Sequence, residues 1–285
     1  DVNKGIECVE FGCAVQNLAQ GEPMDVSRGI NCRVQYEPLG VVAGVTPFNF
    51  PCMVPLWMIP QAITAGNAFI LKPSEQVPYS AIKLAVLLEE AGLPTGILSI
   101  INGGRDAVEA LADHPGIHAF GFVGSTKVAK LTYARAAANA KRALCLGGAK
   151  NHLVVVPDAD PELTAQTLVA SAYGCAGQRC MAASVVIAVG DVQGILDRTV
   201  EIASQMTLGQ DMGSIINAKS VERINGYIDG AEKAGCKILL DGRGATVADA
   251  QGGYWVGPTI IDHVTAEMPA GCEEIFGPVL SIIRV

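Results

Sequence analysis

The run LGVVAGVT, Leu39 to Thr46, is a short apolar stretch that ends in a polar loop, and it predicts a buried strand. A second such run, NAFILKP, follows at 67–73, and a helical pattern comes after it near Tyr79 to Ala91. Gly92 is well placed just after this helix, where Pro94 prevents its continuation. Alternation of buried strands with helices predicts βαβ units, and therefore a parallel sheet covered by helices.

The alternation of strands and helices continues along the chain and leads into a second α/β set. Further strands are expected in ILSIIN, IHAFGFVG, 142–146 and 152–156, with helices near 106–113 and 127–139. After a boundary near Gly147-Gly148, the second set holds helices near 161–173, 193–206 and 219–234, strands at 184–189 and 236–240, and a closing strand after Gly277. The fold class is therefore α/β with a doubly wound, Rossmann-like first domain.

Composition sets the broad class of the protein. The 285 residues are 50% hydrophobic and 17% charged, with 32 Gly and 15 Pro, which suits a globular α/β chain with many tight turns. A net charge of -8 weighs against a non-specific nucleic-acid binder, which normally has a basic face, and no basic run is present, so no nucleic-acid partner is expected.

The ends of the chain and its apolar stretches bear on targeting. Stretches such as 51–63 are interrupted by Pro or polar residues and are too short to cross a bilayer, so no membrane span is expected. No targeting segment is visible. The chain starts in what looks like the middle of a helix and stops within a strand-like run, so it is expected to be truncated at both ends.

Nine cysteines are scattered without a repeating spacing, and no CxxC pair exists. The four histidines do not cluster with them, so no metal site is expected. We expect a reducing compartment and mostly buried, inert thiols.

A doubly wound sheet binds nucleotides at the carboxyl ends of its strands, yet the usual G-x-G-x-x-G fingerprint is absent. The nearest substitute is GFVGST, Gly121 to Thr126, which lies at a strand end and opens a helix, so that its amides could face a phosphate. A plain glycine turn is the alternative interpretation.

Two further segments follow predicted strands. In TPFNFP, 46–51, Asn49 sits beside prolines that fix the loop, so it could be a rigid amide donor or a helix cap. In LKPSE, 71–75, Lys72 and Glu75 could bind sugar hydroxyls as donor and acceptor, or be ordinary surface charges.

The segment YGCAGQRCMA, 173–182, holds two candidate nucleophiles. Cys180 follows a polar loop with a permanent cation next to it, whereas Cys175 lies in a run that continues the preceding helix. The residue types favour Cys180 without excluding Cys175. In EEIFGPV, 273–279, Glu274 and Phe276 could hold a ribose and a flat ring.

Taken together, TPFNFP, KPSE, GFVGST, LGGAKNH, GQRCMA and EEIFGPV, in this order and over nearly the whole chain, resemble the aldehyde dehydrogenase superfamily. The runs PLWMIPQAI, GGAKNH and GQRCMA are most similar to its CoA-acylating branch, which oxidises methylmalonate and malonate semialdehydes.

The resemblance implies the central part of such an enzyme. Residues 1–19 would be a helix of the NAD-binding domain, 20–36 an oligomerisation β-arm, 37–148 the NAD-binding domain and 149–285 an incomplete catalytic domain. It also implies a homo-oligomer, dimer or tetramer, in the cytoplasm of a bacterium or the mitochondrial matrix of a eukaryote.

The resemblance also assigns roles to individual residues. Cys180 would be the nucleophile, Cys175 would contribute to packing, and the Asn49 amide with the Cys180 backbone N–H would hold the oxyanion. The NAD contacts implied by the resemblance are Thr46, Phe48, Lys72, Glu75, Ser125, Glu274 and Phe276. Glu75 favours NAD over NADP, because a carboxylate beside the adenosine ribose repels a 2′-phosphate.

One departure from the hydrolytic members is informative. They carry a Glu immediately before LGG as the general base for water, and Cys145 stands there in this chain. A thiol with an ordinary pKa near 8.5 is a poor substitute for a carboxylate, so CoA is the expected acyl acceptor. For a malonate-type substrate the resemblance implies loss of CO2, with acetyl-CoA or propionyl-CoA as the product.

Substrate binding depends on two cations in this interpretation. Arg179 could hold the substrate carboxylate as a bidentate partner, or it could bond loop carbonyls in a structural role. The family's second carboxylate-binding Arg corresponds to Lys4, which keeps the charge without the planar fork. Two alternatives stay open: a hydrolytic NAD-dependent dehydrogenase that uses another base, and an inactive protein kept for binding or structure.

Overall fold

In the computed structural model, which describes residues 1–247 and 252–285, the run at 39–46 forms β3, the central strand of a parallel sheet. The strand order is β5-β4-β3-β6-β7, and β3 pairs in parallel with both β4 and β6. The five strands are β3 (Val41–Val45), β4 (Ala68–Lys72), β5 (Leu98–Ile100), β6 (Ala119–Val123) and β7 (Arg142–Leu146). The order reverses between β3 and β6, so the predicted doubly wound topology is confirmed.

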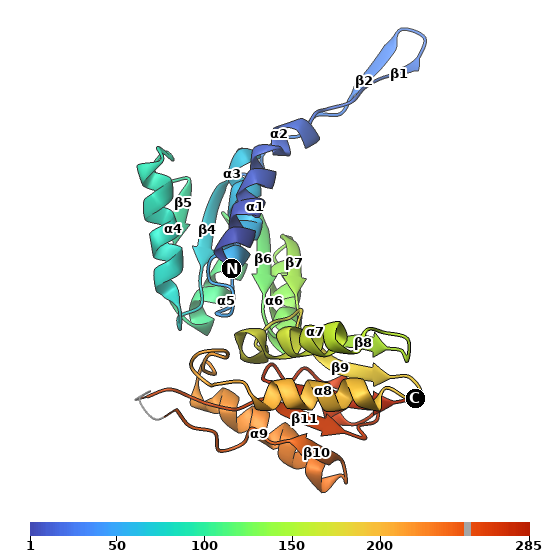
Figure 1. Cartoon of the computed structure of the whole chain (residues 1–285). Coiled ribbons are helices and arrows are strands. Elements are labelled where there is room, and N and C mark those ends of the chain that lie inside the picture. Colours follow the sequence, from blue (N-terminus) through green and yellow to red (C-terminus); the bar gives the residue numbers. More distant parts are fainter. Residues whose placement is uncertain (248–251) are drawn as a thin grey trace. The chain divides into compact units, whose positions relative to one another are not determined.

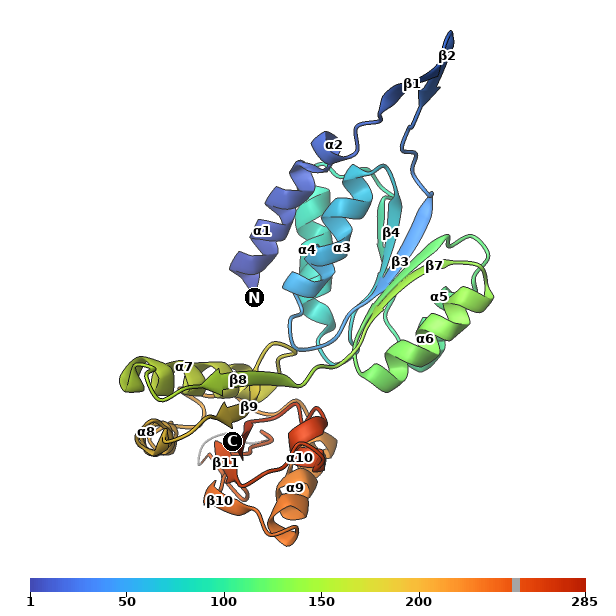
Figure 2. The same cartoon turned by 90° about the vertical axis from the view of Figure 1, so that its right-hand side faces the viewer.

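Helices cover both faces of this sheet (Figure 2). On one face lie α3 (Met53–Thr64) and α4 (Pro78–Glu90), which connect β3 to β4 and β4 to β5. On the other face lie α5 (Arg105–Asp113) and α6 (Thr126–Ala138), which flank β6 in the sequence. This is the arrangement that right-handed crossovers impose once the strand order reverses.

The alternation of side chains along β3 fills two separate cores. Val42 packs on the α3 side with Ile59 and Leu71, both essentially inaccessible to solvent. Ala43 and Val45, which point to the opposite face of the strand, belong to the core on the α5 and α6 side. Because successive side chains point to opposite faces, one short apolar run can anchor both helical layers.

The first 36 residues form a helical segment and a hairpin. The helix expected over 1–19 is interrupted: α1 covers Val2–Cys13 and α2 covers Val15–Leu18, with Ala14 between them. The stretch expected to form an arm is an antiparallel hairpin of β1 (Pro23–Ser27) and β2 (Ile30–Arg33), and all residues of both strands are exposed.

The chain divides into two compact units, Asp1–Gly147 and Gly148–Val285, so the division falls at the glycine pair where a boundary was expected. Figure 1 colours the first unit from blue to green and the second from yellow-green to red. The second unit has a sheet of order β10-β11-β12-β9-β8, in which only the β10–β11 pair is antiparallel among the described strands. Its strands are β8 (Asn151–Val155), β9 (Ala183–Ala188), β10 (Lys237–Leu240), β11 (Thr259–Asp262) and β12 (Val279–Arg284), and its longer helices are α7 (Pro161–Tyr173), α8 (Gln193–Ser204) and α9 (Ala218–Lys233).

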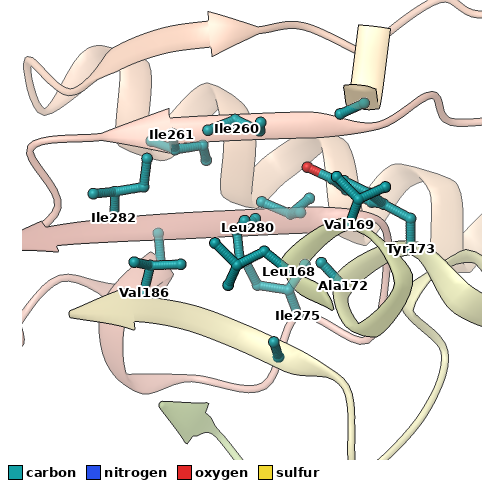
Figure 3. Close-up of a cluster of buried hydrophobic side chains, with 14 of the residues drawn as sticks. Leu168, Val169, Ala172, Tyr173, Val186, Ile260, Ile261, Ile275, Leu280 and Ile282 are labelled. Carbon is teal, nitrogen blue, oxygen red and sulfur yellow. The ribbon is translucent and has the colours of Figure 1, made fainter. Parts of the chain in front are cut away.

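The core of the second unit joins the sheet to α7, α8 and α9, and Figure 3 shows the part of it around α7. Leu168 and Tyr173 of α7 point toward the apolar side chains of β9, β11 and β12 and are inaccessible to solvent. The Tyr173 hydroxyl is satisfied there, because it donates to the Thr259 carbonyl oxygen at 3.1 Å.

Several expectations about local structure were wrong. The sequence analysis identified no helix over 53–64, because Pro60 interrupts the pattern, and it missed β11 and the short helix α10 (Pro269–Cys272). The nine cysteines are free, but only Cys236 is buried, so the expectation of mostly buried thiols is also wrong. Four of the exposed or half-buried ones lie in α1, the hairpin or the loop before α3, which are at the surface of their unit.

Over the described residues no helix is long and apolar enough to span a membrane. Within the same ranges no three His, Cys, Asp or Glu side chains are grouped so that they could hold a metal ion.

The core on α7 gives a matched stability test. Leu168→Ala removes a side chain with 0% exposure and should lower the free energy of unfolding by about 2–5 kcal/mol, from lost burial plus the cavity that remains. Leu163→Ala on the same helix, where the side chain is 66% exposed, should change it by less than about 0.5 kcal/mol. Urea unfolding of both variants measures the difference, and equal effects would contradict the packing described.

Candidate active site

The carboxyl ends of β3, β4 and β6 gather the residues expected to bind a nucleotide in the first unit. Thr46 directly follows β3, is 3% exposed, and its N–H donates to the Lys72 carbonyl oxygen at 3.1 Å. Ser125 follows β6, the neighbour of β3 on its other side. These residues therefore meet at the edge where the strand order reverses, which is where such sheets bind ligands.

Lys72 and Glu75 form a polar pair at this edge. The Lys72 Nζ donates to Glu75 Oε2 at 2.9 Å, and the lysine side chain is 5% exposed against 56% for the glutamate. Partial burial opposes ionisation of Glu75, but hydrogen bonds from Lys72 and from the backbone outweigh it and lower the pKa of the carboxyl. The pair offers a buried donor and an exposed, ionised acceptor to the hydroxyls of a sugar.

Ser125 occupies the N-cap position of α6. Its backbone is extended, with φ -67° and ψ 147°, and its hydroxyl makes no capping hydrogen bond with the described first turn. The amides at the start of a helix carry a partial positive charge and favour anions. The expectation that Gly124-Ser125 lies at a strand end and opens a helix is confirmed.

A cavity of about 630 Å³ lies between α5 and α6, close to the start of α6. Val108, Val128 and Leu131 supply its apolar surface, while Arg105 and Arg135 supply charge. The sequence analysis did not identify this cavity. Two helices line it, and the pattern of a single helix does not show which other helix packs beside it. An apolar cavity beside a helix N-terminus fits a nucleotide, with the ring in the cavity and the phosphates at the amides.

Asn49 lies in the loop between β3 and α3 and is half-buried. The alternative role as a cap of α3 belongs to other residues: Cys52 is at the N-cap position, and the Asp1 carboxylate accepts hydrogen bonds from the amides of Cys52 and Met53, at 3.1 and 2.8 Å. The loop that carries Asn49 is thus fixed at its far end by a carboxylate more than fifty residues away in the sequence.

In the second unit, the segment 173–182 leaves α7 through a tight left-handed turn. Cys175 and Ala176 have φ values of 54° and 52°. The expectation that Cys175 continues the preceding helix is therefore wrong. Cys175 is exposed, which contradicts the expected role in packing, whereas Cys180 is half-buried. The turn reverses the chain, and Cys180 therefore lies in a loop just before β9.

Three side chains hold this loop in place. Gln178 is 5% exposed, and its amide accepts from the Ile216 N–H at 3.0 Å and donates to the Ser214 carbonyl oxygen at 3.1 Å. Asn151, at the start of β8, donates to the carbonyl oxygens of Cys180 and Ala182 at 2.7 and 3.0 Å. The sequence analysis quoted the run that contains Asn151 but assigned it no role.

Arg179 is the third of these side chains. Its Nη2 donates to the carbonyl oxygens of Ala170 and Ser171, at 2.9 and 2.7 Å, in the last turn of α7. Gly174 leaves room for it, because a Cβ there would lie 2.5 Å from Nη2. These bonds favour the structural alternative for Arg179. Lys4, the other expected substrate cation, pairs on the surface of α1 with Glu7 at 2.9 Å. Substrate binding by either residue stays a prediction.

The loop before β12 lies directly against the Cys180 loop. Gly177 has φ +67°, and a Cβ on it would lie 2.1 Å from the Gly277 carbonyl oxygen, so the two backbones are in contact. Glu274 is half-buried, and its Oε1 accepts from the Ala149 N–H at 3.2 Å. Phe276 has a positive φ of 55°. The structure thereby brings Cys180, Glu274 and Phe276 to neighbouring loops of one unit.

Lys150 is a further unusual group beside Glu274. Its Nζ is buried and has no hydrogen-bond partner among the described residues. Burial lowers the pKa of Lys150 to about 8, against the opposing effects of Cys272, Glu274 and Glu273. No sequence pattern pointed to this residue, because its burial depends on loops far apart in the chain.

Strand β7 bears on the question of a catalytic base. Cys145 is half-buried against the core on the α5 and α6 side, and this burial raises the pKa of its thiol. Its neighbours in the strand, Leu144 and Leu146, are exposed. The sequence holds no Asp or Glu between Asp113 and Asp158, so this segment supplies no carboxylate to activate water.

The chain is similar to known proteins over its whole length. The model of the aldehyde dehydrogenase family matches residues 1–285. A curated malonate-semialdehyde dehydrogenase from Pseudomonas aeruginosa is 44% identical over 294 residues, which cover 100% of this chain and 59% of that protein.

Two solved structures are similar in fold as well. A methylmalonate-semialdehyde dehydrogenase from Oceanimonas doudoroffii has a TM-score of 0.96 and 46% identity, covering 99% of this chain and 60% of that one. An NAD+ complex of an aldehyde dehydrogenase from Bacillus cereus has a TM-score of 0.95 and 29% identity, covering 100% of this chain and 59% of that one. The chain thus spans about 60% of the length of these relatives.

The backbone contact at Gly177 yields a prediction. Gly177→Ala should lower the free energy of unfolding by at least about 2 kcal/mol, because it combines a left-handed backbone with a collision against Gly277. Gly226→Ala in the interior of α9, where the added Cβ would meet no other side chain or element within 4 Å, should instead raise it by about 0.5–1 kcal/mol. Urea unfolding decides; a Gly177→Ala protein as stable as the parent would show that the contact does not constrain the loop.

Proposed function

The chain belongs to the aldehyde dehydrogenase family, and we propose that it oxidises a malonate-type semialdehyde with Cys180 as the nucleophile, NAD as the oxidant and CoA as the acyl acceptor. The observation that carries this proposal is the loop around Cys180. Its half-buried thiol sits in a segment held by Gln178, Arg179 and Asn151, next to the loop that contains Glu274 and Phe276. Such rigid support is what a nucleophile needs and what an inert surface thiol lacks.

The proposed chemistry begins at Cys180. Its thiolate adds to the aldehyde carbon, which forms a C–S bond and turns the carbonyl oxygen into an oxyanion. The resemblance assigns the stabilisation of this oxyanion to the Asn49 amide and the Cys180 N–H. Loss of a hydride from the same carbon leaves a thioester on Cys180. NAD, when bound, supplies the acceptor for that hydride.

The residues present fit NAD. The buried Lys72 and the ionised Glu75 suit the hydroxyls of a ribose, the uncapped start of α6 at Ser125 suits a pyrophosphate, and the cavity between α5 and α6 suits the adenine ring. Thr46 and Phe48 belong to the same edge of the sheet in the first unit. In the second unit, Glu274 and Phe276 are the proposed contacts of the nicotinamide ribose and ring.

The acyl acceptor follows from what β7 lacks. With Cys145 packed in a core and no carboxylate between residues 114 and 157, this segment cannot activate water for hydrolysis. CoA depends less on such a base, because its thiol loses a proton to solvent far more readily than water does. The resulting thiolate attacks the thioester carbon, and Cys180 leaves as a thiolate. An acyl group with a β-carboxylate can lose CO2, which would give acetyl-CoA or propionyl-CoA.

The names of the relatives support the substrate class, since two of them are semialdehyde dehydrogenases for malonate and methylmalonate. We further propose that the protein is a homo-oligomer, dimer or tetramer. The hairpin β1–β2 supports this, because Met24, Val26 and Ile30 are large apolar side chains that it leaves exposed.

The first test is NADH formation by the full-length protein with malonate and methylmalonate semialdehydes. Sustained turnover is expected only with CoA, and Cys180→Ala should abolish it. Cys175→Ala is the matched control five residues away, and its turnover should stay within about twofold because that thiol takes no part in the reaction. Equal turnover without CoA would support the hydrolytic alternative. No turnover with any of these substrates would support the inactive one.

Cofactor choice tests the proposed role of Glu75. Glu75→Gln should raise kcat/KM with NADP about tenfold or more, because the ionised carboxylate no longer repels a 2′-phosphate. Glu10→Gln, the same change on exposed α1, should leave the ratio of NAD to NADP activity unchanged. Steady-state kinetics with both cofactors measure this ratio, and an unaltered ratio in Glu75→Gln would exclude the residue from the cofactor contacts.

A further inference from the structure

We propose that Asn151 is a positioning residue for the nucleophile: its side-chain amide fixes the main chain of Cys180 and thereby the direction of the thiol and of the Cys180 N–H. This inference rests on the proposed function of Cys180. It adds a requirement to that function: a side chain outside the loop must hold Cys180 by bonding the main-chain carbonyl of Cys180.

The contact itself is specific. The Asn151 Nδ2 lies 2.7 Å from the Cys180 carbonyl oxygen and 3.0 Å from the Ala182 carbonyl oxygen. A side-chain NH2 group has two hydrogens, and two acceptors use both of them. The amide cannot be turned over in this position, because its oxygen would then face two carbonyl oxygens. Both the side chain and the peptide that it binds are therefore held in one orientation.

The pairing of β8 with β9 shows why a side chain is needed there. Asn151 is opposite Ala183, but the next residue of β8, His152, is opposite Val185, so the register shifts past Ser184. Such an irregularity disrupts the regular ladder of main-chain hydrogen bonds. The Asn151 amide donates to the carbonyl oxygens of Cys180 and Ala182, just before this irregularity in β9. It thereby attaches the loop to β8 at a point where main-chain hydrogen bonds between the strands are irregular.

The rest of the loop is anchored on the other side of Cys180. Gln178 is bonded to the segment 214–216 and Arg179 to the end of α7, both before the nucleophile in the sequence. Asn151 is bonded to the Cys180 carbonyl and to Ala182, after it. With anchors on both sides, the backbone of Cys180 has little freedom to rotate. A displacement of about 1 Å at a reacting atom can cost on the order of a hundredfold in rate.

Ser184 offers a matched control for a purely structural role. Its hydroxyl donates to the same Ala182 carbonyl oxygen, at 3.3 Å, but makes no contact with the Cys180 carbonyl. Ser184 lies in β9, so Ser184→Ala removes a local hydrogen bond to the same acceptor without releasing the Cys180 carbonyl. A role in general stability predicts similar effects of both substitutions, whereas a positioning role predicts an effect of Asn151 alone.

The experiment compares Asn151→Ala, Asn151→Ser and Ser184→Ala in the full-length protein, with two readouts. The first is the rate at which iodoacetamide alkylates Cys180, resolved by mass spectrometry of its peptide, with exposed Cys13 in the same sample as the reference thiol. The second is the rate of the first turnover of NADH formation without CoA, which reports formation of the thioester, together with KM for the semialdehyde.

For Asn151→Ala we expect the first-turnover rate to fall at least tenfold with KM within twofold, and Cys180 alkylation to slow at least threefold relative to Cys13. Asn151→Ser keeps one donor and should fall between the parent and Asn151→Ala, while Ser184→Ala should stay within twofold of the parent in both readouts. If Asn151→Ala does not fold, Asn151→Ser carries the same comparison.

Three results would overturn the inference: Asn151 variants within twofold of the parent, equal losses in Ser184→Ala, or a loss confined to KM. Alkylation needs no aldehyde, NAD or CoA. A parent protein without an NADH burst would thus refute the proposed function, while alkylation alone would still decide whether Asn151 positions Cys180.

Discussion

Parallel pairing of strands is the constraint on which both units depend, because it brings equivalent ends of neighbouring strands to one edge. In the first unit, the pairing of β3 with β4 and β6 gathers Thr46, Lys72 and Ser125 at the carboxyl edge. In the second unit, the pairing of β9 with β8 and β12 gathers the segments that precede these strands, so Asn151, Cys180 and Phe276 lie toward the amino edge. Parallel pairing therefore gathers candidate site residues at the carboxyl edge of the first sheet and at the amino edge of the second.

Much of the fold was predictable because its determinants are local. The strand 142–146 and the helix 161–173 were placed with the bounds that the structure has, since a short apolar run and a proline-initiated helix are signals contained in one segment. The helix α3 was missed because Pro60 argues against a helix locally, whereas packing of α1 against it through Gly5 and Gly12 is a tertiary effect. The hairpin strands gave no clear pattern because neither face is buried.

The candidate site was predictable only where motifs mark it. Cys180, Glu274 and Ser125 stand in recognisable runs, so the sequence pointed to them. The roles of Asn151, Gln178 and Lys150 depend on which loops approach one another, and no spacing encodes that. Arg179 shows the same limit in reverse. Its position beside the proposed nucleophile suggested a substrate contact, but its Nη2 is bonded to two carbonyl oxygens of α7.

The proposed acyl acceptor rests on a different observation from the proposed nucleophile. Positioning groups fix the main chain around Cys180, and they act equally whether water or a thiol arrives, so they do not choose between hydrolysis and acyl transfer. Hydrolysis requires a base for water. The exposed side chains of β7 are those of Arg142, Leu144 and Leu146, and the Cys145 thiol packs against the core with its pKa raised by burial. A thiol acceptor needs less activation than water, because about a few per cent of it is already thiolate near pH 7. We therefore propose thioester exchange at Cys180, because β7 and the residues around it hold no carboxylate that could serve as a base for water.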